Sequence, residues 1–282
     1  MPPGNYRVSM SNFSLWTPGN ASELVAVPSA DDDKYSRGVL GVITGSDQYP
    51  GAAVLGVEAA LRTGVGMVRY LGPQRATDLV LQRRPEAVAS NGRVQAWLMG
   101  SGMDHAAIAD AAGASMAEAL SQGVPAVLDG GAFELHTSVT GPTIITPHFR
   151  ELARVLGVGV DTIAADPAAA AERAAGELGL TVLLKGHTTY IAAPDGTRLR
   201  ARSAPSWLAT AGAGDALGGV LGALVATHAE EIVADTGYLA RLGATASVIH
   251  GLAAHRASRG GPLTILDLVA EIPATIAELI GD

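Results

Sequence analysis

The sequence contains no cysteine among its 282 residues. Disulfide bonds, thiolate metal ligands and cysteine nucleophiles are therefore all excluded. Aromatic residues make up only 4% of the chain, whereas hydrophobic residues make up 48% and glycine occupies 35 positions. We therefore expect a well-filled core, built mostly from Ala, Val, Leu and Ile side chains that pack at close distance, and little disorder.

The chain also lacks long apolar runs. None approaches the ~20 residues that a membrane-spanning helix needs, and residues 1–16 lack the basic-then-apolar pattern of a signal peptide. The net charge of −8 argues against a surface that binds nucleic acid or an anionic membrane. It leaves room for a local pocket that binds nucleotide phosphates. We expect a cytoplasmic protein without nucleic-acid or membrane partners.

Several common active-site motifs are absent. The sequence has no GxxxxGK[ST] phosphate-binding loop, no dinucleotide-binding glycine fingerprint after its first predicted strand, and neither HExxH nor GxSxG. Its His, Asp and Glu residues show no zinc-binding spacing. The sequence therefore leaves the ligands of any metal ion unassigned.

What is present is an alternation of strand-like and helix-like segments. Short apolar runs of buried-strand length alternate with small-residue segments of helical length. This order is typical of a parallel sheet with right-handed crossovers. Strands are predicted at residues 38–44, 66–71, 95–99, 125–128, 143–145 and 181–184, a hairpin at 188–193 and 198–201, and helices at 52–63, 105–121, 149–156, 167–178, within 208–227, and at 232–258 and 265–279.

The domain organisation follows from the same pass along the chain. Residues 1–33 are predicted to be an irregular lead-in, with one short helix near residues 22–26. Residues 34–282 contain no linker, repeat or low-complexity segment. We therefore expect a single α/β domain after the lead-in.

Polar and glycine-rich segments follow nearly every predicted strand. In parallel sheets, ligands bind at the carboxyl ends of the strands. Because these segments would all line one edge of one sheet, the sequence predicts a single cleft. The segments are residues 45–51, 100–104, 129–131, 146–148 and 185–189.

The stretch LATAGAGDALGGVLGALVAT, residues 208–227, is predicted to be a glycine-rich loop that leads into a helix. Gly212 and Gly214 are expected to allow positive φ angles and close approach of another group. The amides from Ala211 to Gly214 and the positive end of the helix dipole would form an anion site. Asp215 is either the N-cap of this helix or a general base beside a bound phosphate, and the two roles can coexist.

Three further polar residues follow predicted strands. His148 is interpreted either as a helix cap or as a ligand contact. Lys185 ends a buried strand, where a lysine is unusual unless it pairs or meets an anion, so we favour a phosphate or nucleotide contact over a solvated lysine. Asp129 is expected either to accept hydrogen bonds from loop amides or to take part in catalysis.

Six segments together match one family pattern. They cover nearly all of residues 34–258 and read, in order, KYSRGVLGVITGSDQYPGAAVLGVEAALRTGVG, PAVLDGGAF, ITPHFRELARVLG, TVLLKGHTTYIAAPDG, LATAGAGDALGGVLGALVA and VIHGLAAHRAS. The chain thereby resembles the ADP-dependent NAD(P)H-hydrate dehydratases of the ribokinase-like superfamily. The resemblance implies a three-layer α/β/α sandwich with a mainly parallel central sheet.

The resemblance also implies roles for individual residues. Contacts to the hydrated dinucleotide would come from Ala53, Gly102, His148 and Asp215. Contacts to the adenine nucleotide would come from Lys185, Gly186, His187, Thr188, Thr189 and Gly214. Some positions depart from the family pattern, which usually reads TPHPGE, VLDADAL, GPGL and NPTGN. Here Phe149 and Arg150 replace Pro-Gly, Gly130 and Gly131 follow Asp129, and residues 100–103 and 203–207 read GSGM and SAPSW.

The implied activity is a hydro-lyase reaction, the ADP- or ATP-dependent dehydration of hydrated NADH and NADPH. Asp215 would take the substrate's hydroxyl proton, and Mg²⁺ would bridge the nucleotide phosphates. The alternatives are a thiazole or hydroxymethylpyrimidine kinase of the same superfamily, or a nucleotide-binding protein without catalysis. The lead-in is too short for the epimerase domain that often accompanies the family, so we expect an epimerase on a separate chain. The resemblance also suggests a homo-oligomer, often a tetramer.

Overall fold

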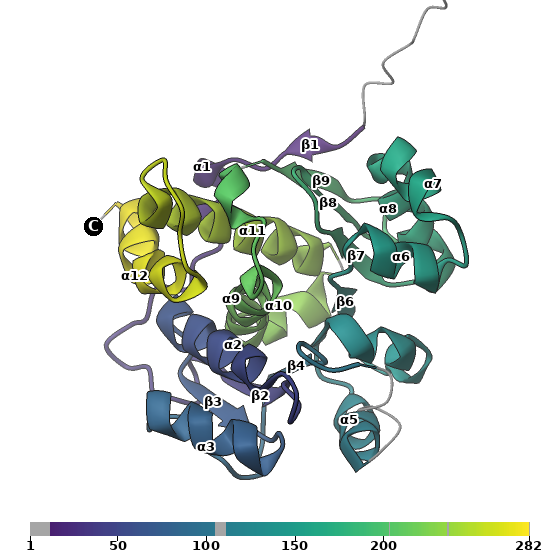
Figure 1. Ribbon diagram of the computed structural model, residues 1–282. Helices are drawn as coiled ribbons and strands as arrows, with labels where there is room; N and C mark the ends of the chain where they lie inside the picture. Colours follow the sequence, from purple (N-terminus) through teal and green to yellow (C-terminus); the bar gives the residue numbers. More distant parts are fainter. Residues whose placement is uncertain (1–11, 105–110, 203, 236, 282) are drawn as a thin grey trace, which may run out of the picture.

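A nine-stranded sheet forms the centre of the protein (Figure 1). The computed structural model describes residues 12–104, 111–202, 204–235 and 237–281. The strand order is β1-β9-β8-β7-β6-β5-β4-β2-β3, and only β8 runs antiparallel to its neighbours. The strands are β1 (Ser14–Leu15), β2 (Val39–Ile43), β3 (Met67–Tyr70), β4 (Ala96–Met99), β5 (Ala126–Leu128), β6 (Thr143–Ile145), β7 (Thr181–Leu184), β8 (Thr189–Ala192) and β9 (Arg198–Ala201).

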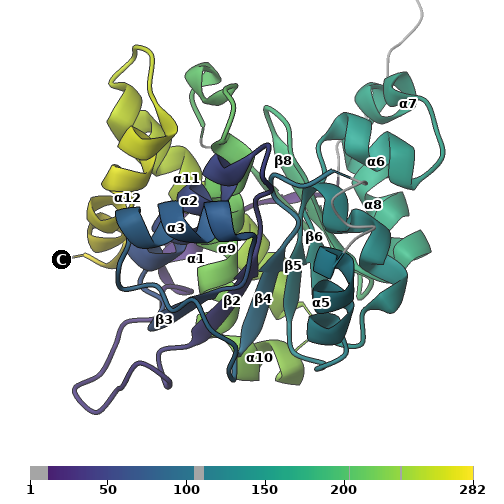
Figure 2. The ribbon, with the colours of Figure 1, turned by 60° about the horizontal axis from the view of Figure 1, so that its bottom comes forward.

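Helices cover both faces of the sheet, so the predicted three-layer α/β/α arrangement is confirmed (Figure 2). Neighbouring residues of a strand point to opposite faces. Leu40 of β2 therefore belongs to the core cluster that includes residues of α2, α9, α11 and α12, whereas Val39 belongs to the cluster on the other face, with residues of α5, α6 and α8. The helices are α1 (Pro18–Ser22), α2 (Pro50–Thr63), α3 (Gln74–Arg83), α5 (Ala111–Leu120), α6 (Phe149–Val155), α7 (Val160–Ala165), α8 (Pro167–Leu178), α9 (Ala213–Thr227), α10 (Ala229–Ala234), α11 (Tyr238–Ser258) and α12 (Ile265–Ile280).

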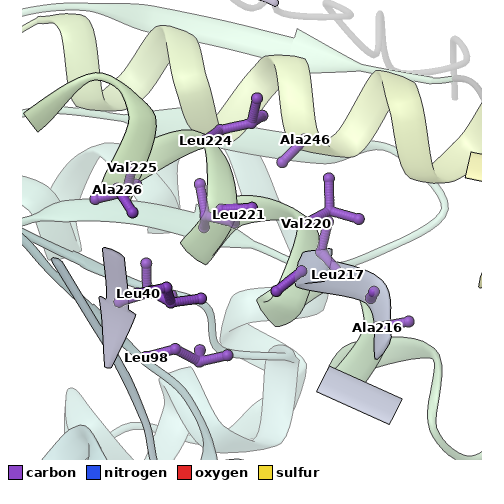
Figure 3. Packing of buried hydrophobic residues seen from close by; sticks show 14 of the residues in the cluster. Leu40, Leu98, Ala216, Leu217, Val220, Leu221, Leu224, Val225, Ala226 and Ala246 are labelled. Atoms are coloured by element: carbon purple, nitrogen blue, oxygen red, sulfur yellow. The ribbon is translucent and has the colours of Figure 1, made fainter. Parts of the chain in front are cut away.

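Helix α9 is the most deeply buried helix on the face of the sheet that carries α2, α11 and α12. All its residues from Ala216 to Ala226 are buried. Figure 3 shows its leucines between Leu40 and Leu98 of the sheet and Ala246 of α11. At Gly219 a Cβ atom would lie 2.2 Å from the carbonyl oxygen of Gly56 in α2, so only glycine permits this close approach. The expected core of small aliphatic residues at close distance is therefore confirmed.

The structure corrects two parts of the secondary-structure prediction. The lead-in is not irregular throughout, because β1 pairs with β9 and α1 begins at Pro18, earlier than the helix expected near residues 22–26. Thr17 caps α1 in a capping box, a signal that the sequence reading missed. The single helix expected at residues 232–258 is two helices, since the Asp235 carboxylate accepts a hydrogen bond from the Gly237 amide and so favours a turn.

Other differences are smaller. Helices α3 and α7 were not predicted. The helix expected at residues 105–121 is present as α5, and the part of that prediction before residue 111 lies outside the described residues. Among the described residues, no helix is both long and apolar enough to span a bilayer.

Glu58 of α2 is a buried carboxylate that joins α2 to α3. It forms ion pairs with Arg62, Arg83 and Arg84, while its own side chain is fully shielded from solvent. Burial acts to raise the pKa of Glu58, but the hydrogen bonds from the three arginines outweigh it and lower the pKa to about 2.

We expect Glu58→Gln to lower the free energy of unfolding by about 2–4 kcal/mol, because the arginines would lose the charge that compensates them. Urea unfolding at neutral pH measures this loss. Since the folded-state pKa is depressed, the difference from wild type should shrink as the pH falls below 4.5 towards 2. Glu86→Gln, at a half-exposed partner of Arg84, should change stability by less than about 1 kcal/mol. Equal losses for the two variants would contradict this role for Glu58.

Candidate active site

Polar side chains from several strand ends converge on Asp129, which directly follows β5. Its Oδ1 accepts hydrogen bonds from Lys185 Nζ at 2.8 Å and from Thr146 Oγ1 at 2.7 Å, and its Oδ2 accepts one from Ser101 Oγ at 2.9 Å. These partners are side chains, so the expected hydrogen bonds from loop amides are not what holds Asp129. Side chains that follow β4, β6 and β7 therefore meet at Asp129, as the predicted gathering of polar segments at one sheet edge requires.

Lys185 and Asp129 form a buried ion pair. Burial alone would neutralise both groups. The pKa of Lys185 is nevertheless raised, chiefly by the charges of Asp129 and Glu151 acting against burial. The pKa of Asp129 is lowered, chiefly by the charge of Lys185 acting against burial. The solvated-lysine interpretation of Lys185 is therefore wrong, and the lysine is held as a fixed positive charge at the sheet edge.

Asp215 is not a helix cap, contrary to one of its two interpretations. Gly212 occupies the N-cap position with φ of 90°, and Asp215 lies three residues later, in the first turn of α9. Its carboxylate makes no hydrogen bond within the described residues. Burial, with a further contribution from the charge of Asp129, raises its pKa to about 6 against the opposing charge of Lys185. Such a carboxylate can accept a proton near neutral pH.

The glycine-rich loop brings the first turn of α9 against Lys185. Gly212 adopts the expected positive φ, but Gly214 lies inside the helix, so the expected positive φ is wrong for Gly214. A Cβ atom at Gly214 would lie 3.3 Å from Lys185 Nζ, so the expected close approach is present there. Ala211 precedes the cap and Ala213 is the first helical residue. The first amides of a helix lack partners within the helix and favour anions.

A cavity of about 490 Å³ opens beside this turn. Its lining includes most of the residues that the resemblance connects with the adenine nucleotide, although Thr188 is not among them. Ser247 and His250 of α11 also line it, and the sequence reading missed both because they lie within a mostly apolar helix. Burial lowers the pKa of His250 to about 4, so this imidazole is neutral. The expected residues in the lining are Lys185, Gly186, His187, Thr189, Ala213 and Gly214.

The residues expected on the substrate side lie around the neighbouring strand ends. Gly102, with φ of 67°, packs closely against Ala52 and the carbonyl oxygen of Tyr49. Ala53 is fully buried in α2. The loop after β2 is tied to the loop after β4 by a 2.7 Å hydrogen bond from the Gly45 amide to the carbonyl oxygen of Ser101. Because Ser101 also binds Asp129, the two sides of the site are mechanically connected.

His148 begins α6 beside Lys185. The Lys185 amide donates a 2.8 Å hydrogen bond to the carbonyl oxygen of Pro147, which holds the two segments together. His148 Nδ1 accepts hydrogen bonds from the amides of Arg150 and Glu151, at 3.1 and 3.2 Å, and Glu151 accepts one from the His148 amide. The capping interpretation of His148 is thus confirmed. Its imidazole remains half-exposed, so a ligand contact stays a prediction.

Comparison with known proteins identifies the family. A family model described as NAD(P)H-hydrate dehydratase matches residues 40–273. The ADP-dependent (S)-NAD(P)H-hydrate dehydratase of Neisseria meningitidis is 36% identical over 217 residues, which are 70% of this chain and 72% of the relative. The bifunctional NAD(P)H-hydrate repair enzyme Nnr of Corynebacterium glutamicum is 38% identical over 89% of this chain. The chain spans about half of that relative's length, 49%.

A solved structure shows the same arrangement. The ADP/ATP-dependent NAD(P)H-hydrate dehydratase from Bacillus subtilis, co-crystallized with ATP/Mg²⁺, superposes with a TM-score of 0.83 at 25% sequence identity. The match covers 95% of this chain and 99% of the other. Since the family model matches most of the sequence and this enzyme shares the whole fold, the chain belongs to the NAD(P)H-hydrate dehydratase family.

Proposed function

We propose that the chain catalyses the ADP- or ATP-dependent dehydration of hydrated NADH and NADPH, which restores the reduced cofactor. The observation that supports this proposal most strongly is the environment of Asp215. Its carboxylate has a pKa of about 6, lies at the first turn of α9 and makes no hydrogen bond within the described residues. A carboxylate that is free to take a proton, next to an anion site, suits phosphoryl transfer to a substrate hydroxyl.

The chemistry requires a better leaving group than hydroxide. Asp215 would take the proton of the substrate hydroxyl while the oxygen bonds to the terminal phosphorus of the nucleotide. The bond from that phosphorus to the nucleotide's bridging oxygen breaks at the same time. The carbon–oxygen bond of the substrate then breaks, assisted by the lone pair of the ring nitrogen, and orthophosphate leaves with the bonding electrons. Loss of a proton from the adjacent carbon to water completes the dihydronicotinamide ring.

The fixed groups of the site would stabilise the charge that develops on the phosphoryl oxygens. The amides from Ala211 to Gly214 would donate hydrogen bonds to them. Lys185 is pinned by Asp129 at 2.8 Å and lies against Gly214, so it needs little reorganisation to act on the same oxygens. Both kinds of donor are in place before the reaction.

The two ligands would occupy different sides of this ion pair. The adenine nucleotide would lie in the 490 Å³ cavity, whose lining includes Lys185, Gly186, His187, Thr189 and Gly214. The hydrated dinucleotide would lie towards Ala53, Gly102 and His148. The Neisseria relative is named as ADP-dependent and the Bacillus enzyme was crystallized with ATP/Mg²⁺, and we extend this nucleotide use to the present chain.

A magnesium ion would arrive with the nucleotide rather than reside in the protein. Among the described residues, no group of three or more His, Asp or Glu side chains is arranged to hold a metal ion. Mg²⁺ commonly binds through substrate phosphates with one or two carboxylates. Its contribution would be to neutralise phosphate charge.

Incubation of the purified chain with hydrated NADH tests the proposal. We expect the absorbance of the reduced nicotinamide to return when ADP or ATP is present, and not in its absence. Accumulation of a stable phosphorylated product would instead indicate a small-molecule kinase. Nucleotide binding without either outcome would indicate a protein that binds nucleotides without catalysis. A homo-oligomer stays a prediction of the resemblance.

Two variants of His148 distinguish its role as a helix cap from a role in substrate binding. His148→Ala should lower the free energy of unfolding by about 1 kcal/mol, and His148→Asn should restore it because asparagine is a good N-cap. If the imidazole also contacts the dinucleotide, both variants should raise the Michaelis constant for hydrated NADH and leave ADP affinity unchanged. Thermal melting and initial rates measure the two effects. A normal Michaelis constant in both variants would leave His148 with the cap alone.

A further inference from the structure

A second hollow lies next to the nucleotide cavity. It has a volume of about 440 Å³ and is lined by His148, Phe149, Arg150, Lys185, Gly186 and His187. Residues 185–187 line both spaces. A ligand group that extends past this shared segment from the nucleotide cavity would therefore enter the second hollow.

Arg150 brings a positive charge to the hollow that no described carboxylate neutralises. Lys185 is matched by Asp129, and Glu151 is engaged with the amide and ring of His148. Arg150 is exposed and makes no ion pair or hydrogen bond through its guanidinium with any described residue. Arg202 does not line the hollow, but its guanidinium lies 3.3 Å from His187 Nε2, and it forms no ion pair in the described part of the chain.

We propose that Arg150, together with Lys185 and His187, forms a subsite for a terminal phosphate group. The choice of ligands rests on the proposed function. A guanidinium presents donors in a planar fork that matches phosphate oxygens, and it stays charged at any physiological pH. Lys185 adds a fixed ammonium on the side of the hollow that adjoins the nucleotide cavity.

Two sources could supply this phosphate. One is the third phosphate of ATP, which ADP lacks. The other is the 2′-phosphate of hydrated NADPH, which hydrated NADH lacks. Each source has a natural partner that differs by the phosphate alone, so a comparison within each pair isolates the subsite.

The test is calorimetric titration of wild type and Arg150→Gln with ADP, ATP, NADH and NADPH. We expect Arg150→Gln to weaken binding of ATP or of NADPH by roughly ten- to a hundredfold, the range for losing a hydrogen bond to a charged group. Binding of the corresponding partner, ADP or NADH, should change by less than about twofold. We call the difference between the losses of affinity within one pair the gap. The pair that shows a gap identifies the source of the phosphate. Equal changes within both pairs would overturn the subsite.

Two further variants keep the test specific. Arg154→Gln removes the same charge from the same helix but outside the hollow, and it should leave all four affinities unchanged. Arg150→Lys keeps the charge without the fork, so it should recover part of the loss, and unchanged binding of ADP and NADH shows that the Gln variant is folded. A gap of the same size in Arg154→Gln would indicate a long-range charge effect and would also overturn the subsite.

Failure of the subsite and failure of the proposed function give different results. Binding needs no turnover, so an expected gap in Arg150→Gln without dehydration by the wild type would remove the function and leave the subsite. Dehydration by the wild type without a gap would remove the subsite alone. No binding of any of the four ligands by the wild type would remove both.

Discussion

Asp215→Asn is expected to lower turnover of hydrated NADH by about 10²–10⁴-fold, the usual loss for a general base. An amide has nearly the same shape as the carboxylate but cannot accept the hydroxyl proton. ADP should still bind, because the amides from Ala211 to Gly214 and the Lys185 ammonium are unchanged. Its affinity should rise slightly, since a negative charge beside the bound phosphates is removed.

The same variant should be more stable than the wild type at neutral pH. The folded-state pKa of Asp215 is about 6, above its ordinary value of 3.8, so the folded protein disfavours the charged carboxylate. This penalty is absent below pH 4, grows as the pH rises to 6 and is complete above it. Asp215→Asn removes the penalty and should gain about 1–3 kcal/mol above pH 7.

Turnover, ADP titration and urea unfolding on one preparation measure these effects. Asp267→Asn is a matched control, because Asp267 lies at the same position in the first turn of α12 and serves in an exposed capping box. It should leave turnover unchanged. If Asp215→Asn keeps more than about a tenth of wild-type turnover, the carboxylate is not the base and the proposed mechanism is wrong.

Removal of either partner of the Lys185–Asp129 ion pair should destabilise the protein strongly, whereas removal of both should not. Lys185→Met leaves a buried, uncompensated carboxylate, and Asp129→Asn leaves a buried ammonium. Each should lower the free energy of unfolding by about 3–5 kcal/mol. The double variant removes both charges and should recover most of the loss. Equal stability of the wild type and the single variants would show that the pair is solvated.

The double variant allows the effect of Lys185 on ligand binding to be measured in a protein of nearly wild-type stability. In the double variant, loss of Lys185 should weaken adenine-nucleotide binding more than binding of the nicotinamide substrate, because the lysine lines the cavity proposed for the nucleotide. Asp129→Asn alone, measured beside it, shows how much of the loss comes from the carboxylate. Calorimetric titration with each ligand gives the comparison. Equal losses for both ligands would remove Lys185 from the nucleotide site.

The sequence predicted the architecture because that information is local. Apolar runs of strand length alternate with helical segments, and this order determines a parallel sheet and the edge where polar residues gather. Asp129 and Lys185 could be placed at that edge without coordinates. Their pairing could not, since Lys185 and Asp129 are separated by 56 residues and meet only through the sheet order.

The remaining misses depend on backbone geometry and packing. Asp215 could be interpreted as a cap because the sequence does not show that the helix begins directly after Gly212. His250 looks like a core residue in a mostly apolar helix, and only the packing of α11 beside α9 brings it to the cavity wall. The break after α10 depends on one side chain, Asp235, binding the backbone two residues on.

The most direct test of the dehydratase mechanism is its stoichiometry. Reduced nicotinamide, orthophosphate and the remaining ADP should be followed together in one reaction of the wild-type chain with hydrated NADH. The account predicts that one orthophosphate appears and one ADP is consumed for each NADH restored, with no phosphorylated product persisting. Recovery of NADH without consumption of nucleotide, or consumption of nucleotide with a stable phosphorylated product, would contradict it.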